Sequence, residues 1–198
     1  MVDETVLFGF KHEISKEEIA ERIANNTLLE VTNNVPVHKG DVFFIESGTL
    51  HAIGKGILIA EIQQNSNTTY RIYDYGRVGK DGKPRELHVE KAKEVTNLVP
   101  PKYPTTAQGA PTAIEGGKET LLRSCEYFNV NKLELDGTTK LTAGEGSFNS
   151  LLVLDGAFEI AAGSEKASAK KGDSLFITAG TGEYTVTGKG TIILTDII

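Results

Sequence analysis

Apolar residues in this chain are grouped in short runs, and glycine or small polar residues bound most of the runs. In the first half, runs of this kind fall at residues 6–10, 42–45, 56–62 and 68–73. In the second half, they fall at 120–125, 128–135, 150–156, 157–160, 171–177, 185–187 and 191–194. Strands this short and this frequent predict a mainly β protein built as an antiparallel sandwich or barrel. The Asp155-Gly156 pair predicts a hairpin turn between two of these strands.

Two short helices interrupt the predicted strands. Ser15 and Glu18 form a capping box, in which the Ser15 hydroxyl accepts from the Glu18 amide and the Glu18 side chain reaches back. Apolar residues follow at helical spacing, which predicts a helix over 15–26. A second helix is predicted over 87–95, where His88 is expected to act as a cap.

The composition limits the classes of function. The 198 residues carry a formal net charge of −6, which disfavours binding to nucleic acid, because such proteins are basic on the binding face. No apolar run is long enough to span a membrane, and no signal peptide is visible. The single cysteine, Cys125, cannot form an internal disulfide. These features predict a soluble cytoplasmic protein with no nucleic-acid or membrane partner.

A stretch of the first half is repeated in the second half. Residues 39–51 and 171–183 both begin with Lys-Gly-Asp, continue to Phe-Ile and reach Gly-Thr at the same spacing. Such a repeat predicts two copies of one supersecondary unit. The position of His51 in the first copy is taken by Glu183 in the second.

The spacing of the glycines and of His51 in the first copy resembles the second half of the cupin signature. This resemblance implies two cupin, or jelly-roll, units: a partial catalytic cupin at 1–99, truncated at its N-terminus and carrying the short helices, and a second cupin at 118–198. Residues 100–117, which are rich in proline, are expected to form a linker or crossing segment. The second copy lacks the histidine and is expected to bind no metal.

Residues 47–56, 61–74 and 82–88 narrow the resemblance further. These segments resemble the class I mannose-6-phosphate isomerases, especially their short bacterial form. The resemblance implies interconversion of mannose 6-phosphate and fructose 6-phosphate with the help of one zinc ion. Such an isomerisation moves a proton between C1 and C2 through a cis-enediol, so it needs a base and a cation near the developing oxyanion.

The same resemblance implies roles for individual residues. His51 corresponds to a zinc ligand, and Arg71 corresponds to the catalytic arginine. Glu61 lines the pocket and is a candidate base, while Asn67 is placed at a substrate-binding position. Arg85 is interpreted either as a contact to the substrate phosphate or as a surface partner of the neighbouring glutamate. His51 and Arg71 are expected to face one shared cavity.

The resemblance covers only the C-terminal portion of the family. The other three zinc ligands, a glutamine, a histidine and a glutamate, are implied to lie outside this chain. Three interpretations follow: a truncated isomerase with weak or no activity alone, one half of a split isomerase, or a non-catalytic cupin that binds a sugar phosphate. A split enzyme would be completed by an N-terminal polypeptide or by a homo-oligomer.

Overall fold

The structure is a computed structural model that describes residues 4–74, 78–79, 81–83 and 85–197. The chain divides into two compact units, Met1–Thr105 and Thr106–Ile198. Each unit has its own buried hydrophobic cluster. Among the described residues, neither α-helix has the length and apolar character needed to cross a bilayer.

The first unit is built on a three-stranded antiparallel sheet. Its central strand is β1 (Thr5–Phe10), which pairs with β2 (Thr32–Pro36) on one side and with β3 (His51–Ile53) on the other. Phe8 and Phe10 of β1 are buried. Their burial anchors the sheet on the core, as expected for alternate side chains of a half-buried strand.

The predicted first helix is confirmed as α1 (Lys16–Ala24), which a 3-10 turn, η1 (Leu28–Glu30), follows. Ser15 caps it as expected, because its hydroxyl accepts from the Glu18 amide at 3.0 Å. The other half of the predicted capping box is wrong. The Glu18 carboxylate instead accepts from Nε of Arg22 at 2.8 Å, one helical turn away, where opposite charges on a helix face attract each other.

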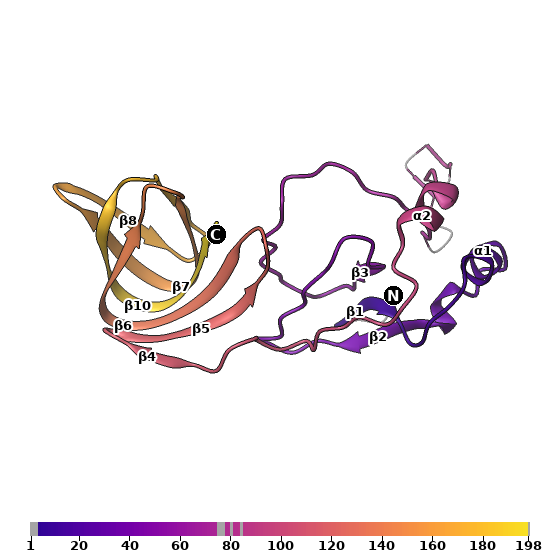
Figure 1. Ribbon diagram of the computed structural model, residues 1–198, viewed down its shortest axis with the longest axis horizontal. Helices are drawn as coiled ribbons and strands as arrows, with labels where there is room; N and C mark the ends of the chain where they lie inside the picture. Colours follow the sequence, from indigo (N-terminus) through magenta and orange to yellow (C-terminus); the bar gives the residue numbers. More distant parts are fainter. Residues whose placement is uncertain (1–3, 75–77, 80, 84, 198) are drawn as a thin grey trace. The chain divides into compact units, whose positions relative to one another are not determined.

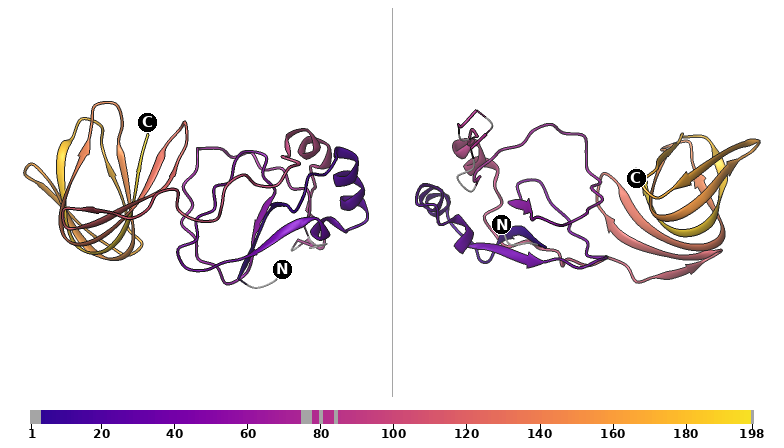
Figure 2. Two further views of the ribbon diagram at one scale, coloured as in Figure 1. Left: turned by 60° about the horizontal axis from the view of Figure 1, so that its bottom comes forward. Right: turned by 180° about the vertical axis from the view of Figure 1, so that it is seen from behind.

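The predicted second helix is confirmed as α2 (Val89–Val95), and it lies beside α1 (Figures 1 and 2). Ala92 of α2 and Ile19 of α1 belong to one buried cluster together with Ile72. His88 stands at the N-cap position, but its side chain makes no capping bond. The prediction that this side chain caps the helix is therefore wrong.

The strands predicted at 42–45, 56–62 and 68–73 are not strands in the structure. A strand requires a neighbouring backbone for its hydrogen bonds, and within the described part of the chain no ladder includes these segments. Leu58 is 92% exposed and Ile59 is 46% exposed. Figure 1 shows the segment between β3 and α2 as a long trace without strand arrows.

The second unit is an antiparallel sheet with the strand order β4-β5-β6-β10-β7-β8, and β9 pairs with β7. Its strands are β4 (Thr112–Ile114), β5 (Gly117–Ser124), β6 (Asn129–Ala143), β7 (Asn149–Ala162), β8 (Glu165–Lys170), β9 (Ser174–Ile177) and β10 (Gly182–Asp196). The sheet is strongly curved (Figure 2). The mainly β fold is thus confirmed, and β4 lies within the stretch interpreted as a linker.

The hairpin predicted at Gly156 is wrong, because β7 runs through this position without turning. Gly156 has φ +83°, and the pairing of β7 with β10 shifts its register between Thr191 and Ile192. A glycine in a left-handed conformation at such a shift is typical of a β-bulge. A Cβ atom at Gly156 would lie 1.9 Å from the Lys189 carbonyl oxygen, so the close approach of β10 also requires glycine.

Candidate functional site

The repeated Lys-Gly-Asp segments form the same turn in both units. The carboxylate of Asp41 accepts from the backbone amide three residues earlier at 2.8 Å, and that of Asp173 accepts from its equivalent at 2.9 Å. Gly40 and Gly172, between these partners, have φ of +98° and +92°. The repeat seen in the sequence is therefore a repeat of local structure.

The second turn of the repeat leads to different side chains in the two units. Gly48 and Gly180 have φ of +85° and +78°, and each is followed by a threonine whose amide donates to the carbonyl three residues earlier. Three residues beyond these glycines stand His51 and Glu183. Glu183 forms an exposed ion pair with Lys140 at 3.3 Å. The second copy thus places a surface salt bridge where the first copy has an imidazole.

His51 begins β3, opposite Phe8 of β1, and its side chain is exposed. Its Nδ1 lies 2.9 Å from the carbonyl oxygen of Thr49. Because a carbonyl oxygen only accepts, Nδ1 carries the proton and donates this bond. Nε2 then keeps its lone pair, and an imidazole whose other nitrogen donates to a carbonyl is the usual arrangement of a metal ligand.

The described residues do not form a zinc site by themselves. Among them, no group of three histidine, cysteine, aspartate or glutamate side chains is placed to share an ion. A catalytic zinc takes three protein ligands and keeps an open position. His51 therefore fits the chemistry of one ligand, and the described side chains do not complete the set.

Arg71 is held by its backbone rather than by its side chain. Its carbonyl oxygen accepts from the His88 amide at 2.7 Å, and its own amide donates to Nδ1 of His88 at 3.2 Å. The side chain of Arg71 is half-buried, and no carboxylate of the described residues pairs with it. No local pattern in the sequence relates Arg71 to His88, because the two residues are 17 positions apart in the chain.

Arg85 is bound to Asp74. Nε of Arg85 donates to one Asp74 oxygen at 2.6 Å, and a terminal nitrogen donates to the other. Asp74 is 8% exposed, and the bond to it raises the pKa of the Arg85 guanidinium. The structure therefore pairs Arg85 with a buried carboxylate, and the expected surface partner Glu86 is not the residue it binds.

Glu61 and Asn67 lie in the open segment between β3 and α2, and both are exposed. Within the described ranges, no hydrogen bond or ion pair links either residue to His51 or Arg71. The structure brings Arg71 to His88 and Arg85 to Asp74. The shared cavity of His51 and Arg71 stays a prediction.

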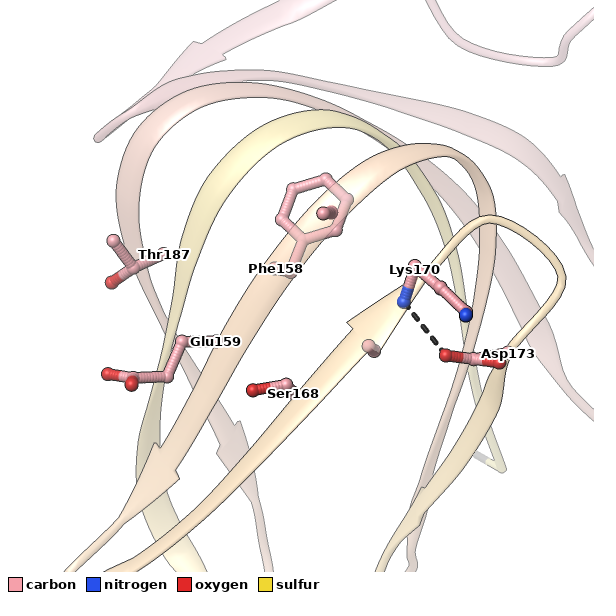
Figure 3. A pocket seen from close by; sticks show the side chains of 8 residues that line it. Phe158, Glu159, Ser168, Lys170, Asp173 and Thr187 are labelled. Atoms are coloured by element: carbon pink, nitrogen blue, oxygen red, sulfur yellow. Dashed lines mark hydrogen bonds between the residues drawn. The ribbon is translucent and has the colours of Figure 1, made fainter.

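Cavities lined by described residues lie away from these side chains. A small one of about 120 Å³ in the first unit is lined in part by Thr49, Asn97 and Lys102. An open one of about 550 Å³ lies in the second unit (Figure 3), lined by residues that include Phe158, Glu159, Ser168, Lys170, Asp173 and Thr187. The Asp173 carboxylate in it is already engaged by the Lys170 amide. None of the residues implied to be functional lines either cavity.

Comparison with known proteins connects both units to one family. Residues 117–197 match the family described as mannose-6-phosphate isomerase, cupin domain. The mannose-6-phosphate isomerase ManA of Bacillus subtilis is 37% identical over 195 residues, which is 98% of this chain and 61% of that protein. Residues 117–197 thus match this family's cupin domain, and nearly the whole chain is similar to a mannose-6-phosphate isomerase. The mannose-6-phosphate isomerase of Streptococcus mutans is also 37% identical, over 88% of this chain and 54% of that protein.

The fold agrees with this assignment. The crystal structure of the mannose 6-phosphate isomerase from Bacillus subtilis matches with a TM-score of 0.86 and 30% identity, covering 98% of this chain and 60% of that one. The predicted cupin-type isomerase family is therefore confirmed. The chain spans about three fifths of the length of the family members that it matches.

Proposed function

We propose that this chain takes part in the isomerisation of mannose 6-phosphate and fructose 6-phosphate. The observation that carries the proposal is the 37% identity to the Bacillus subtilis ManA across 98% of the chain. The structural match with a TM-score of 0.86 supports it, because it includes the segments that carry His51, Glu61 and Arg71. The substrate class is a small phosphorylated sugar, with no nucleic acid or membrane involved.

Two side chains of the open segment are assigned to the reaction. Glu61 is the candidate base that takes the proton from C2 of the aldose and returns it at C1, while a proton is gained at O1 and lost from O2. The Arg71 guanidinium stabilises negative charge on the enediolate oxygen. The exposure of Glu61 and the absence of a carboxylate partner for Arg71 among the described residues support these roles.

Asn67 and Arg85 are assigned to substrate binding. Arg85 uses two of its nitrogens to hold Asp74, and it is half-exposed, so its remaining N–H groups face solvent. A guanidinium with free N–H groups is suited to a phosphate oxygen. The exposed amide of Asn67 is suited to a sugar hydroxyl.

His51 is assigned to a zinc site that other residues complete. The donor bond from its Nδ1 to Thr49 supports the assignment, because it directs Nε2 outward. The described residues supply no further cluster of ligands for this site.

A complementing polypeptide would also explain the apolar segment at 56–62. Leu58 and Ile59 are exposed there, although such side chains are normally covered in a stable fold. An extended backbone without a ladder accepts an added β-strand readily. The added strand would come from a complementing N-terminal polypeptide or from a second copy of this chain. Cys125 is a free, half-buried thiol, which favours the cytoplasm.

The test is turnover of mannose 6-phosphate by the purified chain, alone and mixed with a polypeptide that supplies strands and the missing zinc ligands. Turnover should appear or rise on mixing, together with about one bound zinc per complete site. Arg71→Ala is expected to abolish it, whereas Lys166→Ala, at an exposed position in the second unit, is the control. A chain that binds mannose 6-phosphate but turns over none in any mixture would support the alternative, a non-catalytic sugar-phosphate-binding cupin.

A further inference from the structure

His88 contacts the backbone of Arg71 at both of its polar groups. The His88 amide donates to the Arg71 carbonyl at 2.7 Å, and the Arg71 amide donates to Nδ1 of His88 at 3.2 Å. Since Nδ1 accepts a bond, it carries no proton, so the neutral imidazole has its proton on Nε2. His88 thus satisfies both the backbone donor and the backbone acceptor of Arg71.

This double contact occurs where the open segment joins the core. Residues 61–70 are mostly exposed, whereas Ile72 is 5% exposed within the cluster that includes Ala92 of α2. His88 is the residue that precedes α2, so it is fixed by the helix behind it. Arg71 therefore sits at the boundary, and His88 ties its backbone to the packed helix.

The ring of His88 is itself supported. The Tyr70 ring lies with its centroid 6.0 Å from that of His88, and Nζ of Lys91 lies 5.9 Å from the Tyr70 centroid. The aromatic contact and the cation over the ring restrict the orientation of the imidazole. A restricted imidazole keeps Nδ1 directed at the Arg71 amide.

We propose that His88 is the positioning residue for Arg71, holding the Arg71 peptide so that the guanidinium extends from a fixed point. This inference rests on the proposed function, in which Arg71 contacts the substrate. A guanidinium contributes to transition-state stabilisation only when it is placed in advance, because displacements of about 1 Å reduce rates strongly. His88 contacts no substrate in this proposal and acts through Arg71 alone.

The test compares two substitutions of His88 in the full chain. His88→Phe keeps a ring beside Tyr70 but removes the acceptor, whereas His88→Asn keeps an acceptor oxygen close to the position of Nδ1. Hydrogen exchange of the Arg71 amide should speed up by about tenfold in His88→Phe, since one hydrogen bond is lost, and should return towards the wild-type rate in His88→Asn. The Ile14 amide, which donates to the Leu98 carbonyl, is the internal reference and should not change.

Turnover provides the second readout, in the mixture that gives isomerase activity. His88→Phe should lower kcat by about tenfold with little change in KM, and His88→Asn should recover most of the loss. Equal exchange rates in wild type and His88→Phe, or no recovery in His88→Asn, would overturn the proposal. Arg71→Ala separates the proposed role of Arg71 in turnover from the proposed role of His88 in positioning it. This variant should abolish turnover, yet leave the amide of residue 71 protected from exchange by His88.

Discussion

The carboxylates of Asp41 and Asp173 accept the same hydrogen bond in two turns of identical design, at 2.8 and 2.9 Å. Both turns belong to the repeated segment, and both contain a glycine in the left-handed region. The repeat therefore preserves the backbone of the turn while the functional position differs, with His51 in one copy and Glu183 in the other. The two aspartates therefore have the same structural role in their units, whichever residue occupies the functional position.

Replacing either aspartate with alanine should destabilise its own unit by a similar amount. Each substitution removes a bond between a backbone amide and a charged acceptor, which contributes about 1.5–3 kcal/mol. Urea unfolding followed by NMR signals of each unit would measure Asp41→Ala in the first unit and Asp173→Ala in the second. A loss in the unit that was not altered would show that the turns do not act locally.

Two glycines with similar φ should respond very differently to alanine. Gly156 and Gly172 have φ of +83° and +92°, so both substitutions carry the cost of a left-handed side chain, about 1–2 kcal/mol. At Gly172 the new methyl group meets nothing within 4 Å, whereas at Gly156 it meets the Lys189 carbonyl oxygen at 1.9 Å. Gly156→Ala should therefore cost at least about 2 kcal/mol more, because β10 must move away from β7.

The measurement for this pair is the free energy of unfolding of the second unit. Gly172→Ala is the matched control, since it imposes the same backbone strain without the clash. Equal losses for the two variants would contradict the close approach of β10 at the bulge.

The ion pair of Arg85 and Asp74 should stabilise the first unit more than an exposed ion pair of the same unit does. Asp74 is buried, so a variant without Arg85 leaves a buried negative charge that is less well balanced by a positive partner. Arg85→Met should speed exchange of the Gly79 amide several-fold, because this amide donates to the carbonyl of Lys83, two residues before Arg85. Arg85→Lys should recover only part of the protection, because lysine cannot bind both oxygens in the same geometry. Lys93→Met is the control: it breaks the exposed pair with Glu90 and should leave the Gly79 amide unchanged.

Alkaline pH should destabilise the second unit through Tyr184. Burial raises the pKa of this phenol, the charge of Asp196 adds to the rise, and the bond donated by Asn149 opposes it. Above the ordinary tyrosine pKa of about 10, the unfolded chain loses the proton more readily than the folded one. Stability should therefore be retained below about pH 10 and fall as the pH rises further, since the unfolded state then binds fewer protons.

The urea midpoint of the second unit at about pH 9 and pH 11 would measure this effect. Tyr184→Phe should reduce the difference between the two midpoints, because it removes the titrating group. Tyr127→Phe, at a 48% exposed position where the bond with Glu126 raises the phenol pKa, should remove a smaller part of the difference than Tyr184→Phe does. An unchanged difference in Tyr184→Phe would assign the alkaline loss to other groups.

The sequence by itself determined the helices, the strands β5, β6, β7, β9 and β10 of the second unit and the repeated turns. These features depend on neighbours in the chain: Ser15 caps three residues ahead, and each Lys-Gly-Asp segment closes on itself. The alternating runs of the second unit find partners along the same chain, so the pattern and the ladder agree. The family resemblance also came from contiguous segments, and it was confirmed.

Only the tertiary structure decided which strand-like segments pair with a neighbouring strand and which distant residues come into contact. The runs at 56–62 and 68–73 have strand-like sequences, but no ladder of the described residues includes them, since pairing depends on a second backbone. Gly156 bends a continuous strand because β10 lies against it, although Asp-Gly by itself favours a turn. The contact of His88 with Arg71 arises because α2 packs on the core. The spacing of these two residues along the chain does not indicate that contact.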